Sequence, residues 1–245
     1  MPVTRPPEAD ALSTSTQAAL RARHAVAMGY KARSKDIQDA WKAIQKDPAW
    51  PELQSALRAI FHDKCAYCEI IVPRDVEHYY PKSRYPDRMF LWTNLLFACK
   101  NCDTDKGQRF PVVHGQPQLI DPCDGDPALY ITWDLPSGRP IPTEDAGRKE
   151  RALQTLDALP QLRHQSLADE RRRVAQYFQF LLAQAVEESP TPPDVVDWLE
   201  DELSPARPWR SVRRQIVRDP ANRPLIDRVR TQVPRVAPLL DLLLA

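Results

Sequence analysis

Four of the five cysteines form two Cys-x-x-Cys pairs, and this spacing suits one bound metal ion. The pairs are Cys65 with Cys68 and Cys99 with Cys102. Four thiolates of this kind bind a tetrahedral zinc ion, with Zn–S distances of about 2.3 Å. Because the pairs lie 30 residues apart in the chain, a shared zinc ion would close a long loop. We therefore predict a structural zinc site that frames the segment 65–102.

An acidic residue and a histidine are neighbours inside that loop, as Glu77-His78, with Pro81 three residues further on. A histidine with a pKa near neutrality can take a proton from water. A carboxylate can bind a divalent cation, which offsets the charge that develops on a phosphate and on its leaving oxygen. Hydrolysis of a phosphodiester needs both groups, so His78 is the candidate general base and Glu77 a candidate cation ligand. Neighbouring strand residues point to opposite faces, so the pair needs a bend or a strand end at 77–78.

A second carboxylate, Asp103, directly follows the second cysteine pair. Together with Glu77 it would make an oxygen-rich site that prefers Mg²⁺ or Mn²⁺ to a second zinc ion. Asp103 is also a favourable N-cap residue for a helix that we expect to run towards Arg109, and it can bind the cation only if its side chain is not used in capping. Lys106 would lie on the same helix face as Asp103, one turn on, where it could contact a phosphate. The candidate nucleic-acid contacts are Lys106 and two residues of the polar, basic loop 81–90, Lys82 and Arg84.

The order of these motifs resembles a known family. The chain reads Cys-x-x-Cys, Glu-His-x-x-Pro, Asn-Leu and Cys-x-x-Cys-Asp-x-x-Lys, which resembles the HNH endonucleases and their ββα-metal module. Lys-Cys-Ala-Tyr-Cys-Glu at 64–69, Trp-x-Asn-Leu at 92–95 and Leu-Ile-Asp-Pro at 119–122 are similar to one subfamily. That subfamily contains the HNH subunit of Septu antiphage systems and the HNH proteins of some retron systems. The resemblance is strongest over about residues 50 to 135.

The resemblance implies a metal-dependent endonuclease, acting on DNA rather than RNA, that serves as the effector of an antiphage system. His78 then matches the general base, and Asn94 matches the residue that holds the loop orienting it. Asp103 stands where the family usually has His or Asn, which leaves an oxygen ligand but changes the metal geometry. Glu77 replaces the commoner Asp with a longer side chain of similar chemistry.

The periodicity of apolar residues predicts an α+β fold that is mostly α, with a zinc-pinned ββα module between N-terminal helices and a C-terminal helical region. We expect a loose tail over 1–10 and helices at 11–29, at 35–46 and from Pro51 to Phe61. A β-hairpin of 69–72 with 76–79 should follow, and the apolar residues 90–97 then form a buried strand or a turn before the second cysteine pair. Residues 110–142 read as irregular, with short strands at 119–122 and 129–133 packed on the zinc module.

From Ala146 onward the pattern is helical again, with one apolar stripe through Leu153, Leu156 and Leu159 and a longer one that includes Leu167, Val174 and Phe178. The expected division of the chain is 1–50 for the N-terminal helices, 51–135 for the nuclease module and 136–245 for the C-terminal helices.

Charge is segregated near the end of the chain. Residues 187–202 hold seven acidic residues and no Lys or Arg, whereas 207–235 hold nine arginines against Asp219 and Asp227. Segregated charge can steer oriented docking with a partner. The resembling Septu proteins work with an ATPase subunit, and this sequence has no phosphate-binding loop motif of its own. We therefore expect residues 145–245 to bind an ATPase. In the competing interpretation, the arginines bind nucleic acid.

Composition adds few constraints. The net charge of +1 gives no general argument for nucleic-acid binding, so any such argument is local. No window approaches the roughly 18 apolar residues of a membrane span, and an odd number of cysteines in this spacing favours cytoplasmic metal binding over disulfides. Two alternative functions stay open at this point: a zinc-containing nucleic-acid-binding adaptor without catalysis, and a toxin nuclease that acts alone.

Overall fold

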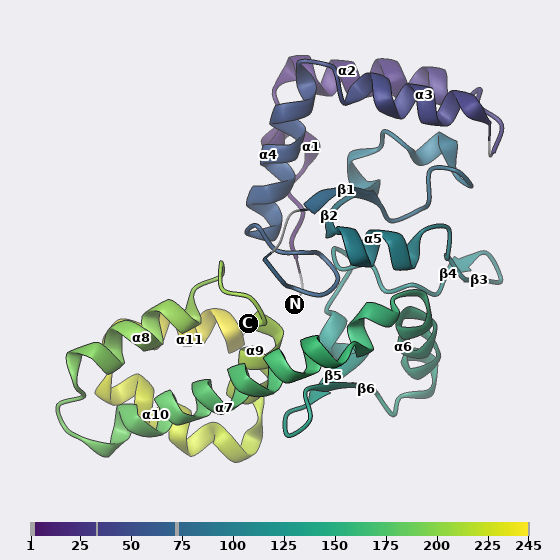
Figure 1. The fold of residues 1–245 in the computed structure, drawn as a ribbon. Coiled ribbons are helices and arrows are strands. Elements are labelled where there is room, and N and C mark those ends of the chain that lie inside the picture. Colours follow the sequence, from purple (N-terminus) through teal and green to yellow (C-terminus); the bar gives the residue numbers. More distant parts are fainter. Residues whose placement is uncertain (1–2, 33, 72–73, 245) are drawn as a thin grey trace. The chain divides into compact units, whose positions relative to one another are not determined.

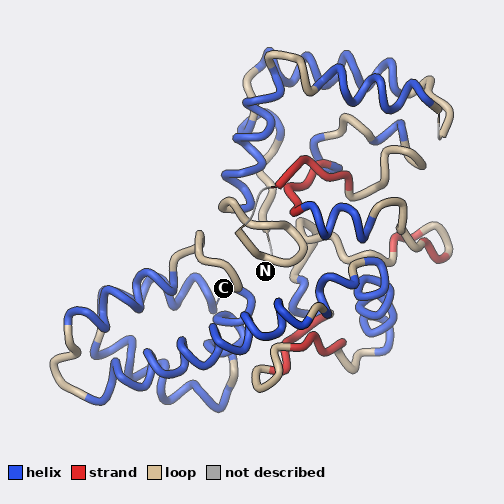
Figure 2. The backbone as a smooth tube through the Cα atoms, in the orientation of Figure 1, coloured by secondary structure: helices blue, strands red, loops and turns tan. Residues whose placement is uncertain are grey.

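The computed structural model describes residues 3–32, 34–71 and 74–244. The fold is α+β and mostly helical, with three small two-stranded antiparallel sheets in the described part (Figures 1 and 2). The helices are α1 (Glu8–Ala11), α2 (Thr14–Ala27), α3 (Lys35–Ile44), α4 (Ala49–Phe61), α5 (Lys100–Lys106), α6 (Ala146–Ala158), α7 (Gln165–Glu187), α8 (Pro193–Leu203), α9 (Arg210–Arg218), α10 (Arg223–Gln232) and α11 (Ala237–Leu244). The strands are β1 (Arg74–His78), β2 (Leu95–Cys99), β3 (Val112–Val113), β4 (Gln116–Pro117), β5 (Ile131–Asp134) and β6 (Arg139–Pro142).

The described chain divides into two compact units. One, here called the N-terminal unit, comprises residues up to Tyr130 together with 144–161, so it contains α1 to α6 and the two sheets β1–β2 and β3–β4. The other, the C-terminal unit, comprises 131–143 and 162–244, so it contains the β5–β6 hairpin and α7 to α11. The helices before residue 50 therefore share a unit with the cysteine pairs.

Two helices of the N-terminal unit form on the predicted apolar stripes. Ile37, Trp41 and Ile44 of α3 are buried, as are Leu53, Leu57 and Phe61 of α4. The helix α4 contacts both β1 and β2. It ends at His62, where φ is +50°, and the chain turns directly into the first cysteine pair.

The predicted β-hairpin is wrong in its partner strand. β1 pairs with β2 rather than with 69–72, in an antiparallel register that places Glu77 opposite Leu96 and His78 opposite Leu95. Residues 69–71 are not in a strand, and 72–73 lie outside the described residues. The first cysteine pair explains the difference, because the Cys65 N–H donates to the Ile70 carbonyl and the Ala66 N–H donates to Phe97. The tight turn around the cysteines thus uses the backbone that a hairpin would need.

The helix after the second cysteine pair starts earlier than predicted. α5 begins at Lys100, and Cys99 is its N-cap, since the Cys99 sulfur accepts a hydrogen bond from the Cys102 N–H. Asp103 therefore lies in the first turn and is not the cap. The helix ends at Lys106 instead of Arg109, because Gly107 takes a positive φ of 46° that other residues rarely adopt.

The expected loose N-terminal tail is instead fixed against the rest of its unit. Arg5 donates from Nη1 to the Trp92 carbonyl over 2.7 Å, and the Trp92 indole N–H donates to the Pro6 carbonyl over 3.0 Å. The Val3 N–H donates to the Pro122 carbonyl over 3.1 Å. Residues 119–122 form no strand. Their contact with the cysteine-framed segment is a side-chain bond, from the Tyr79 hydroxyl to the Leu119 carbonyl over 2.6 Å.

The C-terminal unit is built around the long helix α7, which contacts α8, α9 and α10. The predicted apolar stripe is confirmed at Leu167 and Phe178, whereas Val174 is only half-buried. Ala168, Arg171 and Ala175 extend the buried face. The guanidinium of Arg171 lies 4.0 Å from the ring centroid of Trp133 and 4.9 Å from that of Trp209. The predicted strand 129–133 appears as β5, but it pairs with β6 and contacts α9.

One predicted stripe of α6, in the N-terminal unit, is also corrected, because Leu153 is exposed and Ala152 lies inside with Leu156 and Leu159. The Thr155 hydroxyl of this helix accepts a hydrogen bond from the Ile120 N–H over 2.9 Å. This bond fixes α6 to residues 119–122. None of the described helices has the length and apolar character required to span a bilayer.

Three arginines of the basic block pair with carboxylates of the acidic block inside the C-terminal unit. Arg235 pairs with Glu200 over 2.6 Å and with Asp197 over 3.4 Å, and Arg207 pairs with Asp201. Arg213 is only 2% exposed and pairs with Glu202. Part of the charge that is segregated in sequence is therefore paired within the unit, so the segregation alone does not indicate an external partner.

Candidate metal and catalytic site

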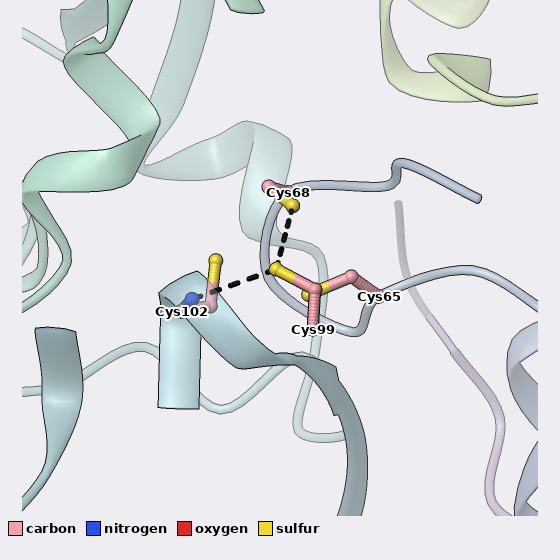
Figure 3. Close-up of side chains that lie close together, drawn as sticks. All are labelled: Cys65, Cys68, Cys99 and Cys102. Carbon is pink, nitrogen blue, oxygen red and sulfur yellow. Dashed lines mark hydrogen bonds between the residues drawn. The ribbon is translucent and has the colours of Figure 1, made fainter. Parts of the chain in front are cut away.

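The four paired cysteines converge at one point, as Figure 3 shows. Their Sγ atoms all lie within 4.8 Å of one another, and all four residues are buried. Cys65 and Cys68 come from the turn after α4, whereas Cys99 ends β2 and Cys102 lies in α5. The Cys68 and Cys99 sulfurs are 3.7 Å apart. A tetrahedron with Zn–S bonds of about 2.3 Å has S–S edges of roughly 3.8 Å, so this donor set fits the ion. The cluster could hold a metal such as zinc.

The surroundings of the cluster favour thiolate over thiol at Cys99. The pKa of Cys99 is lowered below its usual range, mainly because its sulfur accepts hydrogen bonds from Cys102 and from the other cysteines, and the Cys102 N–H adds to this. A backbone N–H at the start of a helix stabilises negative charge. Cys123 is outside this cluster, and burial raises the pKa of its thiol to about 11. It is therefore not a ligand candidate.

His78 ends β1 and is enclosed by its neighbours. Only 2% of the residue is exposed, and its ring lies 4.3 Å from the Trp41 ring between centroids, edge to face. Nε2 lies 3.1 Å from the Met89 carbonyl, an acceptor, so Nε2 carries the proton and Nδ1 offers a lone pair. Nδ1 has no hydrogen-bond partner among the described residues. Burial, followed by the charges of Lys82 and Lys106, lowers the pKa of His78 well below its usual range, so the imidazole is neutral.

The neighbouring Glu77 is buried on the same strand and contacts Lys106. The Lys106 ammonium donates to Glu77 Oε1 over 2.5 Å and to the His78 carbonyl over 2.6 Å, and the lysine is 0% exposed. The pKa of Glu77 is raised to about 7, first by burial; Lys106 lowers it, and a hydrogen bond with Asp103 raises it. Two carboxyl groups therefore meet here, one from β1 and one from α5.

Asn94 closes the loop that follows His78. Its Oδ1 accepts a hydrogen bond from the Tyr80 N–H over 2.7 Å, and its Nδ2 donates to the carbonyls of Tyr80 (3.1 Å) and Arg88 (2.9 Å). The Asn94 carbonyl accepts from the Tyr79 N–H over 2.9 Å. The asparagine is buried, so these bonds are shielded from water. One side chain thus ties both ends of the loop 80–88 next to the histidine.

The three candidate nucleic-acid contacts differ in their exposure to solvent. Lys82 is half-buried, with its ammonium 5.5 Å from the Trp41 ring centroid, and burial lowers its pKa. Arg84 donates from Nη1 to the carbonyls of Gln108 and Phe110 over 3.2 and 3.0 Å. Lys106 is inaccessible and engaged with Glu77. In this arrangement only Lys82 and Arg84 reach the surface.

The structure therefore brings together His78, Glu77, Asp103 and Lys106, with Asn94 behind the adjoining loop. The described residues hold no second group of three His, Cys, Asp or Glu side chains placed to share a metal ion. Sequence reasoning missed Trp41 and Met89, which enclose the histidine. Trp41 was assigned only to the apolar stripe of α3, and no sequence signal marks a backbone carbonyl such as that of Met89.

The comparisons with known proteins concern parts of the chain. No protein-family model matches it. It is similar to a Septu protein PtuB of Bacillus thuringiensis, with 39% identity over 62 residues, covering 23% of this chain and 24% of the relative. A Septu protein PtuB of Bacillus mycoides (strain KBAB4) is 25% identical over 138 residues, covering 40% of this chain and 47% of the relative. In both cases the chain spans less than half the length of the relative.

Proposed function

We propose that this chain is a metal-dependent HNH endonuclease that hydrolyses phosphodiester bonds, of DNA rather than RNA, as the effector of an antiphage defence system. The observation that carries the proposal is the neutral imidazole of His78. Its Nδ1 lone pair is free among the described residues, and the next residue along the strand, Glu77, interacts with Asp103 and Lys106. The order of motifs between the cysteine pairs, which resembles HNH enzymes, supports the same assignment.

In this proposal His78 takes the proton from the attacking water at Nδ1. Its Nε2–H stays bonded to the Met89 carbonyl, which fixes the tautomer and the ring plane. Asn94 keeps the loop 80–88 closed behind the imidazole. Because the ring is almost fully covered, the side chain of Lys82 above Trp41 must move when a substrate enters. A lysine in that place can then pair with a phosphate, and Arg84 lies two residues further along the same loop.

Glu77 and Asp103 would hold the catalytic Mg²⁺ or Mn²⁺. Their carboxylate oxygens are the ligands that such cations prefer, and two adjoining carboxyl groups are costly to ionise together without a counter-charge. A bound cation supplies charge stabilisation at the phosphate and the leaving oxygen. The role of Lys106 is revised here: it balances and orients Glu77 instead of binding a phosphate. The four cysteines would hold zinc as a structural ion that keeps β2, α5 and the turn after α4 together.

The proposed role in antiphage defence and the proposed ATPase partner both rest on similarity to Septu proteins. The two similar proteins are Septu proteins, and the motifs resemble the HNH subunit of Septu antiphage systems, which works with an ATPase. We propose that residues 145–245 bind such an ATPase. Since the charge blocks of this region pair with each other, complementary charge does not support the site.

A non-catalytic nucleic-acid-binding adaptor is the second candidate function. It is favoured by the hydrogen bond of the Lys106 ammonium to Glu77 and by the burial of His78, which is 2% exposed. The two candidates separate in a cleavage assay with plasmid DNA and with RNA, in Mg²⁺, Mn²⁺ or EDTA. His78→Gln places an amide near the Met89 carbonyl and removes the base, so it should lose activity by on the order of 10²–10⁴-fold. His114→Asn is the matched control, because it removes an exposed imidazole where φ is +48°, a conformation that Asn tolerates. Cleavage by His78→Gln at the wild-type rate would refute the role of His78, and no cleavage by wild-type protein would favour the adaptor.

A further inference from the structure

A pocket of about 650 Å³ lies in the N-terminal unit, beside the candidate site. Three separate segments line it: the start of α3, the loop after β1 and the residue stretch that follows α5. These segments lie at the same edge of the unit in Figure 1. The lining residues are Ser34, Lys35, Ile37, Gln38, Ser83 and Gln108. Of these, only Ser83, which follows Pro81-Lys82, belongs to the motifs that gave the resemblance.

The chemistry of the lining suits an anionic ligand with many hydrogen-bonding groups. Lys35 is exposed and no carboxylate pairs with it among the described residues. The amides of Gln38 and Gln108 and the hydroxyl of Ser83 offer neutral donors and acceptors. Among the residues that the structure describes, no acidic side chain lines the pocket. The hydroxyl oxygen of Ser34 is buried and has no hydrogen-bond partner among the described residues. A sugar-phosphate backbone presents the complementary groups.

The pocket is continuous with the candidate site through direct contacts. Ile37 in the pocket and Trp41 lie one helical turn apart on the same buried face of α3, and the Trp41 ring lies against His78. Ser83 directly follows Lys82, whose ammonium lies over that same ring. At the other wall, the Gln108 carbonyl accepts from Arg84. The surroundings of His78 and the pocket lining are therefore connected through Trp41, Lys82 and Arg84.

We propose that this pocket is a nucleic-acid subsite that holds the part of the strand flanking the scissile phosphate. Lys35 pairs with a phosphate there, and Gln38, Ser83 and Gln108 contact the adjoining sugar, phosphate or base edge. The proposal rests on the proposed function for its substrate. It assigns a substrate-binding role to the first turn of α3, which lies outside the cysteine-framed segment.

The test measures binding separately from cleavage. A His78→Gln protein in EDTA is titrated with a fluorescently labelled DNA oligonucleotide at several salt concentrations, with and without Lys35→Glu. The matched control is Lys42→Glu, which makes the same charge change on the exposed last turn of the same helix, outside the pocket. Lys35→Glu should not weaken the helix, because an acidic residue is favourable in its first turn.

We expect Lys35→Glu to weaken binding about tenfold and to reduce the salt dependence by about one released ion, and Lys42→Glu to do neither. Gln38→Ala should weaken binding with little change in the salt dependence. Equal effects of the two charge reversals, or no measurable binding, would overturn the subsite. If wild-type protein does not cut but Lys35 still carries binding, the proposed activity fails and the subsite stands. If Lys35→Glu binds and cuts as wild type does, the subsite alone fails.

Discussion

Two buried side chains, Arg213 of the C-terminal unit and His78 of the N-terminal unit, differ in how their nitrogens are bonded. In the C-terminal unit, all three guanidinium nitrogens of Arg213 donate hydrogen bonds. Nε and Nη2 donate to Glu202, and Nη1 donates to the Pro208 carbonyl over 2.5 Å. In the N-terminal unit, His78 has one nitrogen bonded and the other without a partner among the described residues, and Glu77 has a raised pKa beside it. A buried group whose bonding capacity is used up stabilises a fold, whereas one with capacity left over can act on a ligand.

The largest expected effect comes from the cysteine cluster, because its four thiolates join the turn after α4, the end of β2 and α5 at one point. Cys99→Ser should unfold or precipitate the N-terminal unit, since structural zinc contributes its binding free energy to folding, on the order of 10 kcal/mol. Elemental analysis should find one zinc per chain in wild-type protein. Cys123→Ser is the control and should keep that zinc. Well-folded wild-type protein without zinc would contradict the prediction.

The next largest effect on stability is expected from the buried ion pair between Arg213 and Glu202 in the C-terminal unit. Arg213→Ala leaves the Glu202 carboxylate buried without its main partner, which should cost about 3–5 kcal/mol of unfolding free energy. Arg223→Ala removes an exposed pair with Asp227 on α10 and should cost less than about 0.5 kcal/mol. Urea unfolding of both variants measures the difference. Equal stabilities would mean that the buried pair is no more important than a surface pair.

The same contrast explains how much of the molecule the sequence predicts. The cysteine cluster, the stripes of α3 and α4 and the α+β class follow from short-range spacing, which directly sets which side chains share a face or a turn. The partner of β1 was missed because residues 69–72 are apolar enough for a strand. Only the turn around Cys65 shows that backbone groups of Glu69 and Ile70 already bond to Cys65.

The charge blocks and the catalytic candidates needed three-dimensional information. Sequence shows that 187–202 and 207–235 have opposite charge, but it cannot show that Arg235 and Arg207 meet the acidic block within one unit. Likewise, the spacing of Lys106 after Asp103 predicts a shared helix face, yet the burial of its ammonium against Glu77 depends on how α5 packs on β1. Long-range packing decides both outcomes.

The smallest predicted effect is a pH dependence specific to His78. Its pKa in the folded protein is well below the value of about 6.5 that an unfolded histidine has, chiefly because of burial. Below pH 6.5 the unfolded chain therefore binds a proton that the folded chain does not. Protonation of the unfolded chain therefore lowers the free energy of unfolding as the pH falls below about 6.5, by at most about 1.4 kcal/mol per pH unit. Above that pH the histidine is neutral in both states and has no such effect.

Comparing two proteins isolates this contribution, because the thiolates and Glu77 titrate in both. The free energy of unfolding is measured in urea for wild-type and His78→Gln protein between pH 7.5 and 5.5. The wild-type value should fall more steeply below pH 6.5, whereas His114→Asn, which removes an exposed imidazole, should follow the wild-type curve. Parallel curves for wild type and His78→Gln would show that the fold does not hold His78 neutral. A buried arginine such as Arg213 gives no comparable signal, since a guanidinium stays charged throughout this range.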